Sequence, residues 1–300
     1  MKPLWGIDLG GTKIEGVIIQ SQENPQELAR LRIPTEASKG YSHILQQIHK
    51  LVKALENESG LTPDSVGIGT PGVLEPSTGT MKNCNTTALN GKPLRADLEA
   101  MLGFPVTMAN DANCFAVAEA FLGAGKPFLD ESEVIFGVIM GTGVGGGIIV
   151  NGKVVTGLQG IAGEWGHNFL DESGGPCYCG RTGCVETILS GPALERHYSC
   201  VNGGQKRPLK EIVARYHEGC EDARPTMERM CHFFGKALAS VINVLDPGVI
   251  ILGGGVGNID LLYTEGVRSV ERFTFNSHLE TRILKPKLGD SAGVFGAALL

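Results

Sequence analysis

The sequence predicts an α/β fold of two related lobes that face one cleft. Residues 7–19 and 139–150 each join two apolar strands through a glycine turn with a Gly-Thr pair, which indicates duplicated halves. Segments with apolar residues at helical spacing follow these hairpins. The length of 300 residues favours two intimate domains over one small core.

The first half of the chain alternates strand and helix patterns. Strands are expected over residues 4–8, 13–19, 65–70 and 106–109. Helices are expected from residue 44 to the stop signal Gly60, and from Asn110-Asp111 to about Gly123. Pro71-Gly72 breaks the third strand, and residues 75–91 have no apolar periodicity and are predicted to form a long loop.

The second half opens with a strand over residues 133–140, a glycine turn over 141–147 and a strand over 148–150. A long helix over 224–245, a buried strand over 249–252 and a small-residue helix over 291–300 are expected further on. The predicted domains are residues 1–111, on which residues 290–300 pack back, and residues 112–289.

Composition excludes several classes of protein. The net charge of -6 argues against a nucleic-acid surface, which needs clustered Lys and Arg. No apolar run approaches the roughly 20 residues of a membrane helix, and no signal-peptide pattern opens the chain. We therefore expect a cytoplasmic protein with neither nucleic acid nor membrane as a partner. Its 43 glycines suggest backbone turns that closely approach a phosphate ligand.

Three glycine segments predict a nucleotide site. In the first, Gly10 and Gly11 let backbone N–H groups approach phosphate oxygens, and Thr12 and Lys13 add a hydroxyl donor and a charge. Asp8 would lie near the magnesium of the nucleotide. A plain hairpin turn is the alternative for this segment alone. The second turn is Gly141-Thr142-Gly143, and Gly254 and Gly255 offer a flat backbone surface for an adenine ring.

A cluster of soft ligands predicts a structural zinc site. Cys177, Cys179 and Cys184 lie close together in sequence with His167 upstream, which supplies the four ligands that tetrahedral zinc prefers. The alternative is a set of buried free thiols. A closed coordination sphere would leave zinc a structural role beside the pocket, without a reaction of its own.

Asn110-Asp111 is the candidate catalytic pair, because it stands at the end of a strand. A carboxylate there can accept a proton from a substrate hydroxyl. The alternative is that Asp111 only caps the helix that follows.

The glycine segments, the sequence 163–167 (Gly-Glu-Trp-Gly-His) and the cysteine cluster resemble the ROK family of sugar kinases and repressors over essentially the whole chain. The resemblance implies an actin-like, ribonuclease-H-like ATPase fold with two α/β domains around a cleft. It also implies phosphorylation of a hexose or N-acetylhexosamine by ATP with Mg²⁺, and a homodimer. By the same resemblance, Asp111 is the general base and Asn110 a neighbouring sugar ligand.

The remaining expected sugar ligands are polar groups that read hydroxyls by directional hydrogen bonds. They are Glu164, His167 and Glu186, with Asn85 and Gly72 as sugar neighbours. His167 is expected to give one ring nitrogen to zinc and the other to a sugar hydroxyl. For Glu186, a helix N-terminal carboxylate is the alternative.

Residues 82–91 and 163–168 look most like the bacterial fructokinase and mannokinase branch of the family. The expected reaction is therefore phosphorylation of fructose, with mannose or glucose next. An N-acetylhexosamine kinase or a glucokinase of the same family is the alternative. Two hypotheses from other functional classes are a sugar-responsive repressor and a non-catalytic sugar sensor. The repressor is disfavoured because the first strand is expected within a few residues of Met1, which leaves no room for a helix-turn-helix before it.

Overall fold

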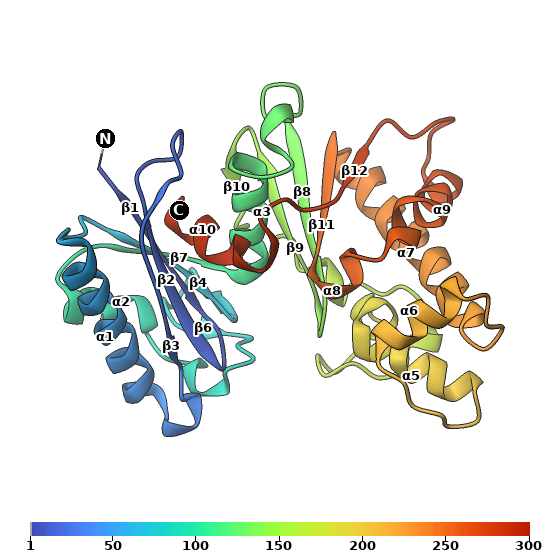
Figure 1. Ribbon diagram of the computed structural model, residues 1–300, viewed down its shortest axis with the longest axis horizontal. Helices are drawn as coiled ribbons and strands as arrows, with labels where there is room; N and C mark the ends of the chain where they lie inside the picture. The colour runs from blue at the N-terminus through green and yellow to red at the C-terminus, as the bar shows by residue number, and fades with distance from the viewer. Residues whose placement is uncertain (1) are drawn as a thin grey trace.

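Two five-stranded sheets with the same arrangement form the framework of the protein (Figure 1). The computed structural model describes residues 2–300. In each sheet an antiparallel hairpin lies beside two parallel strands, which is the duplication that the two glycine-turn hairpins predict. The sheet orders are β3-β2-β1-β4-β7 and β10-β9-β8-β11-β12.

The strands of the first sheet are β1 (Leu4–Leu9), β2 (Lys13–Ile19), β3 (Glu27–Pro34), β4 (Val66–Thr70) and β7 (Val106–Asn110). Those of the second sheet are β8 (Val134–Met140), β9 (Val144–Val150), β10 (Lys153–Val154), β11 (Val249–Gly253) and β12 (Arg282–Leu284). A separate small hairpin pairs β5 (Val73–Leu74) with β6 (Met81–Lys82).

The α-helices are α1 (Tyr41–Ser59), α2 (Leu94–Leu102), α3 (Asp111–Phe121), α4 (Glu186–Leu189), α5 (Gly191–Val201), α6 (Leu209–His217), α7 (Arg224–Leu245), α8 (Gly254–Gly257), α9 (Glu265–Phe273) and α10 (Ala292–Ala298). Short 3-10 helices are η1 (Ala37–Lys39), η2 (Thr87–Leu89), η3 (Lys126–Phe128), η4 (Trp165–His167), η5 (Glu172–Gly174), η6 (Asp260–Tyr263) and η7 (Gly289–Ser291). None of the helices in residues 2–300 has the length and apolar character needed to cross a bilayer.

Two expected loops are shorter or more ordered than the sequence suggests. The second glycine turn covers only residues 141–143, because Gly146 and Gly147 belong to β9. A Cβ on Gly147 would lie 2.7 Å from the Cβ of Ala116, so the glycines let α3 approach the sheet closely. The expected loop over residues 75–91 contains β6 and η2, whose Met81 and Leu89 are buried.

Several elements of the structure were not predicted from the sequence. The edge strand β3 alternates apolar residues with Arg30 and Arg32, a strand pattern that the sequence analysis did not use. The helices α6 and α9 each bury only one narrow stripe. The short strand β12 is half exposed at the other edge of the second sheet. Their formation follows from tertiary packing on the stronger elements β2, α7 and β11.

The chain returns to the first sheet at its C-terminal end. The helix α10 packs on β1 and β4 and also on α3, which itself lies against β8 and β9 of the second sheet (Figure 1). The expected division at residue 111 stays a prediction. What the packing does show is that α3 and α10 occupy the space between the two sheets.

We expect Gly67→Ala to lower the free energy of unfolding by about 3 kcal/mol, the upper part of the usual cost of overpacking. A Cβ on Gly67 would lie 1.8 Å from the carbonyl oxygen of Ala297, so α10 has to move off the sheet. Urea unfolding followed by circular dichroism measures the change. Gly255→Ala is the control, because its Cβ meets nothing within 4 Å. Equal stability of Gly67→Ala and the unsubstituted protein would contradict this account of the α10 contact.

Candidate active site

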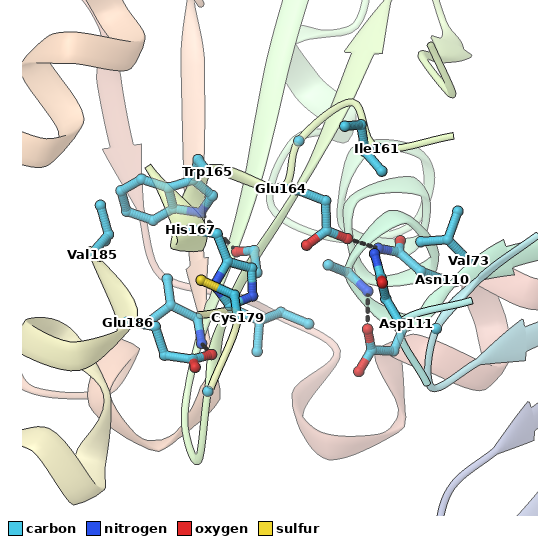
Figure 2. Close-up of a pocket in the computed structure, with 18 of the residues that line it drawn as sticks. Val73, Asn110, Asp111, Ile161, Glu164, Trp165, His167, Cys179, Val185 and Glu186 are labelled. Carbon is cyan, nitrogen blue, oxygen red and sulfur yellow. Dashed lines mark hydrogen bonds between the residues drawn. The ribbon is translucent and has the colours of Figure 1, made fainter. Parts of the chain in front are cut away.

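A cavity of about 1630 Å³ collects the residues expected to bind sugar. It lies between two lobes, the first built on the β3-β2-β1-β4-β7 sheet and the second on the β10-β9-β8-β11-β12 sheet. Figure 2 shows Asn110 and Asp111 on one side of this cavity and Glu186 on the other. The predicted residues in its lining are Gly72, Asn85, Asn110, Asp111, Glu164, His167 and Glu186. They come from both lobes, since Gly72 and Asn85 flank the β5–β6 hairpin and Glu164 precedes η4.

The junction of β7 and α3 presents Asn110 and Asp111 in different roles. The Asn110 side chain accepts a hydrogen bond from the N–H of Asn113, so Asn110 caps the helix. Its amide also donates to a Glu164 carboxylate oxygen at 3.3 Å, which joins the two lobes (Figure 2). The cap of α3 is therefore Asn110, and not its neighbour Asp111.

Asp111 is exposed to the cavity, and the protein on both sides of the cavity surrounds its carboxyl group. Loss of solvation by burial raises the pKa of Asp111 above its ordinary value, and a hydrogen bond from the N–H of Ala112 at 2.8 Å works in the opposite direction. Burial likewise raises the pKa of Glu164, with Asp111 adding to the increase and His167 opposing it. A carboxylate with a raised pKa is a stronger proton acceptor than a solvated one.

A second cavity, of about 220 Å³, connects Asp111 with the residues expected to face the nucleotide. Asp8 and Gly254 line it together with Asp111. Burial, reinforced by the charges of Asp111 and Glu15, raises the pKa of Asp8 to about 6, while Lys13 opposes this increase. Two carboxyl groups that repel one another at one cavity favour a cation between or beside them.

The two glycine turns differ in their relation to these cavities. Gly141, Thr142 and Gly143 line the larger cavity. The Glu186 carboxylate accepts the N–H of Val144 at 2.9 Å, and the N–H of Gly191 donates to the oxygen of Gly141 at 2.8 Å, so both ends of the turn are held. Neither cavity is lined by Gly10, Gly11, Thr12, Lys13 or Gly255.

Gly255 still lies beside the second turn, because its N–H nitrogen would be 4.0 Å from a Cβ on Gly141. Gly254 has a φ of 78°, and a Cβ there would lie 2.3 Å from the oxygen of Met140. Only glycine therefore allows α8 to start this close to the end of β8.

The four predicted metal ligands converge. One ring nitrogen of His167 and the Sγ atoms of Cys177, Cys179 and Cys184 all lie within 4.8 Å of one another. Two of these separations, Cys177 Sγ to His167 Nδ1 and Cys179 Sγ to Cys184 Sγ, are 3.6 Å. Tetrahedral zinc with ordinary bond lengths needs edges of about 3.5–3.8 Å, and a disulfide needs about 2.05 Å. The donor set thus fits zinc, and all eight cysteines are free thiols.

Tight local turns bring these ligands together. The N–H of Cys177 donates to the oxygen of Arg181 at 2.7 Å, which closes the loop around Cys179. Gly183 has a φ of 76°, and a Cβ there would lie 2.5 Å from the oxygen of Asp171. This backbone conformation, which strongly favours glycine, aims Cys184 back toward His167.

Sequence reasoning missed several residues of the site. The Nε2 atom of His167, expected on a sugar hydroxyl, lies 3.0 Å from the hydroxyl of Tyr178. Lys82 donates to the backbone oxygen of Gln159 at 2.8 Å and so ties the β5–β6 hairpin to the second lobe. Val73 and Ile161 add apolar surface to the cavity (Figure 2). The sequence does indicate Val73, because this residue directly follows Gly72, the predicted neighbour of the sugar.

Comparison with known proteins gives matches along the whole chain. An N-acetyl-D-glucosamine kinase of Vibrio atlanticus is 37% identical over an alignment of 306 positions, which covers 99% of this chain and 98% of that protein. A ROK hexokinase from Thermus thermophilus has a similar structure, with a TM-score of 0.87, 30% identity and coverage of 99% and 97%. A ROK family glucokinase from Streptomyces griseus, solved with glucose and AMPPNP, gives a TM-score of 0.77, 28% identity and coverage of 99% and 98%.

These comparisons correct one prediction and confirm others. The fructokinase and mannokinase branch, and fructose as the substrate, were wrong, because relatives at 36–37% identity are N-acetyl-D-glucosamine kinases. That prediction rested on two short segments, residues 82–91 and 163–168, whereas these matches cover 99% of the chain. The actin-like fold with two α/β sheets and their helices is confirmed. A model of the ROK family matches residues 4–300, and the chain belongs to the ROK family.

Proposed function

We propose that the protein is an ATP-dependent kinase of N-acetyl-D-glucosamine. The supporting observation is its full-length similarity to kinases of that name, combined with a cavity that both Asp111 and the Gly141–Gly143 turn line. An acceptor hydroxyl and a phosphate donor can meet between these two features. The cytoplasmic location and the homodimer stay predictions.

The sugar is proposed to lie between Asp111 and the loop of residues 177–184, which carries three of the proposed zinc ligands. Asp111 accepts the proton of the attacking hydroxyl, and Asn110, Glu164 and Glu186 hold the other hydroxyls by hydrogen bonds. The bond between Asn110 and Glu164 joins the lobes, so both lobes act on one substrate. The retained carboxylate and glycine turns favour an enzyme over a non-catalytic sensor.

An acetamido group needs apolar surface for its methyl group, and Val73 with Ile161 supplies it. A Cβ on Gly160 would lie 2.8 Å from Cγ1 of Val73, so the segment carrying Ile161 is seated on the first lobe. The bond from Lys82 to Gln159 holds the same segment. Figure 2 shows Val73 and Ile161 beside the Asn110–Glu164 pair, where they can receive the methyl group.

The phosphates of ATP are proposed to lie against the glycine turns, where backbone N–H groups donate to their oxygens. Asp8, at the adjacent cavity with Asp111, would hold Mg²⁺, whose charge offsets that of the phosphates. His167, Cys177, Cys179 and Cys184 would hold Zn²⁺, which would stabilise the loop that carries Glu186. Lobe closure around both substrates would exclude water and limit hydrolysis of ATP.

We expect MgATP-dependent ADP release to be fastest with N-acetyl-D-glucosamine. Its kcat/KM should exceed that of glucose by about tenfold or more, since one apolar group in a fitted pocket contributes 10–200-fold. A coupled assay with N-acetyl-D-glucosamine, N-acetylmannosamine, glucose and fructose measures this, with a sugar-free reaction as the control. A higher kcat/KM for glucose would replace the proposal with the glucokinase alternative, and no response to any sugar would favour the sensor.

A further inference from the structure

The fully buried carboxylate of Glu119 lies outside the sugar and metal sites, on the last turns of α3. Its Oε2 accepts the N–H of Ala124 at 2.9 Å, close by in the chain. Its Oε1 accepts the N–H groups of Lys287 at 3.0 Å and Leu288 at 2.8 Å, more than 160 residues away. The N–H of Lys287 also lies 3.0 Å from Oε2.

A buried carboxylate at this position destabilises the folded protein unless its hydrogen bonds compensate for the lost solvation. A negative charge near a helix C-terminus faces the unfavourable end of the helix dipole, and burial removes its solvation. Three backbone N–H groups that donate to one carboxylate provide charge-assisted hydrogen bonds in return. The contacts with Lys287 and Leu288 therefore account for a buried glutamate at this point.

The segment that Glu119 holds is the connection from β12 of the second lobe to α10 on the first sheet (Figure 1). The residues on either side of the clamped pair, Pro286 and Gly289, line the smaller cavity together with Asp8 and Gly254. At the start of α10, a Cβ on Gly293 would lie 3.5 Å from the Asp8 carboxyl carbon. The 286–289 segment is thus one wall of the proposed nucleotide site.

Glu119 and Asp111 belong to the same helix. The chain passes from the first sheet to the second at the start of α3, and returns through the 286–289 segment that Glu119 binds near the end of that helix. One helix therefore carries the proposed base at one end and anchors a wall of the nucleotide cavity at the other.

We infer that Glu119 is a positioning residue for the nucleotide, which acts by clamping the 286–289 segment against α3. The inference rests on the proposed ATP site. It assigns Glu119 no contact with sugar, and the larger cavity that holds the sugar ligands is not lined by the 286–289 segment. Weakening the clamp should therefore affect nucleotide binding and leave sugar binding in place.

The test replaces the carboxylate by an amide of the same shape. In Glu119→Gln one oxygen becomes an NH₂ group, which faces N–H donors, so either Ala124 or Leu288 loses its acceptor. We expect the Kd for MgAMPPNP, measured by calorimetry, to rise about tenfold, as for loss of one charge-assisted hydrogen bond. The Kd for N-acetyl-D-glucosamine should stay within about twofold of its value in the unsubstituted protein.

Glu99→Gln is the matched control. Glu99 is also a helix carboxylate that accepts a backbone N–H, that of Val106 at 3.0 Å, and it lines neither cavity. Both of its Kd values should match those of the unsubstituted protein. An unchanged nucleotide Kd in Glu119→Gln, or an equal loss of nucleotide and sugar binding, would overturn the inference. Failure of the unsubstituted protein to bind MgAMPPNP would instead overturn the proposed function.

Hydrogen exchange on the unsubstituted protein tests the clamp even if Glu119→Gln does not fold. The amides of Lys287 and Leu288 should exchange about a hundredfold or more slower than free peptide amides, because their donors are bonded in the native state. Exchange at the rate of an exposed loop would show that the clamp does not form, and would overturn the inference.

Discussion

Replacing Asp111 with asparagine is expected to lower kcat by about 10²–10⁴-fold, the usual contribution of a general base. The amide cannot accept the proton of the sugar hydroxyl, although its oxygen can still accept the N–H of Ala112. Helix α3 keeps its cap, because the cap is Asn110. The variant should therefore fold and bind sugar while it fails to transfer phosphate efficiently.

Steady-state ADP release, calorimetric sugar binding and thermal unfolding together measure this outcome. Asp64→Asn is the control, since Asp64 is an exposed surface residue paired with Lys2 and should leave all three quantities unchanged. Turnover of Asp111→Asn within a few-fold of the control would remove Asp111 from the role of base. A combined loss of folding and sugar binding would make Asp111 a structural residue.

The parts of this site that could be predicted from sequence are those whose chemistry is concentrated in a short segment. Three cysteines within eight residues predict that their thiols lie close together, and in the structure His167 lies beside them. Asn110-Asp111 could be placed at a strand end because an apolar strand directly precedes the pair. The duplicated hairpins likewise predicted two sheets, and the sheets share one strand order.

Long-range partners could not be predicted in the same way. Nothing near Glu119 in the sequence indicates that its carboxylate meets the N–H groups of Lys287 and Leu288. The same holds for Lys82 and Gln159, which meet only because the lobes close on each other. The identity of the sugar could not be predicted for the same reason, because Val73 and Ile161 come to line one cavity only when the chain folds.

Cys179→Ser is expected to abolish zinc binding and to destabilise the second lobe. Structural zinc can contribute on the order of 10 kcal/mol of binding free energy, which is lost when one of four ligands is removed. Cys179 is exposed, so the smaller serine leaves no cavity in a hydrophobic core. Elemental analysis should find one zinc per chain before the substitution and none after it, with a lower thermal midpoint.

Cys200→Ser provides the control, because Cys200 is also exposed and lies outside the cluster. The loop with the proposed zinc ligands leads directly into the candidate active site. Two residues after Cys184, the Glu186 carboxylate accepts the N–H of Val144, and the N–H of Gly191 donates to the oxygen of Gly141. Loss of zinc should therefore weaken the binding of both sugar and MgAMPPNP, since one segment supports the sugar ligands and the second glycine turn. A zinc-free Cys179→Ser protein that stays stable and fully active would show that the thiols pack without a metal and that the turn does not depend on this loop.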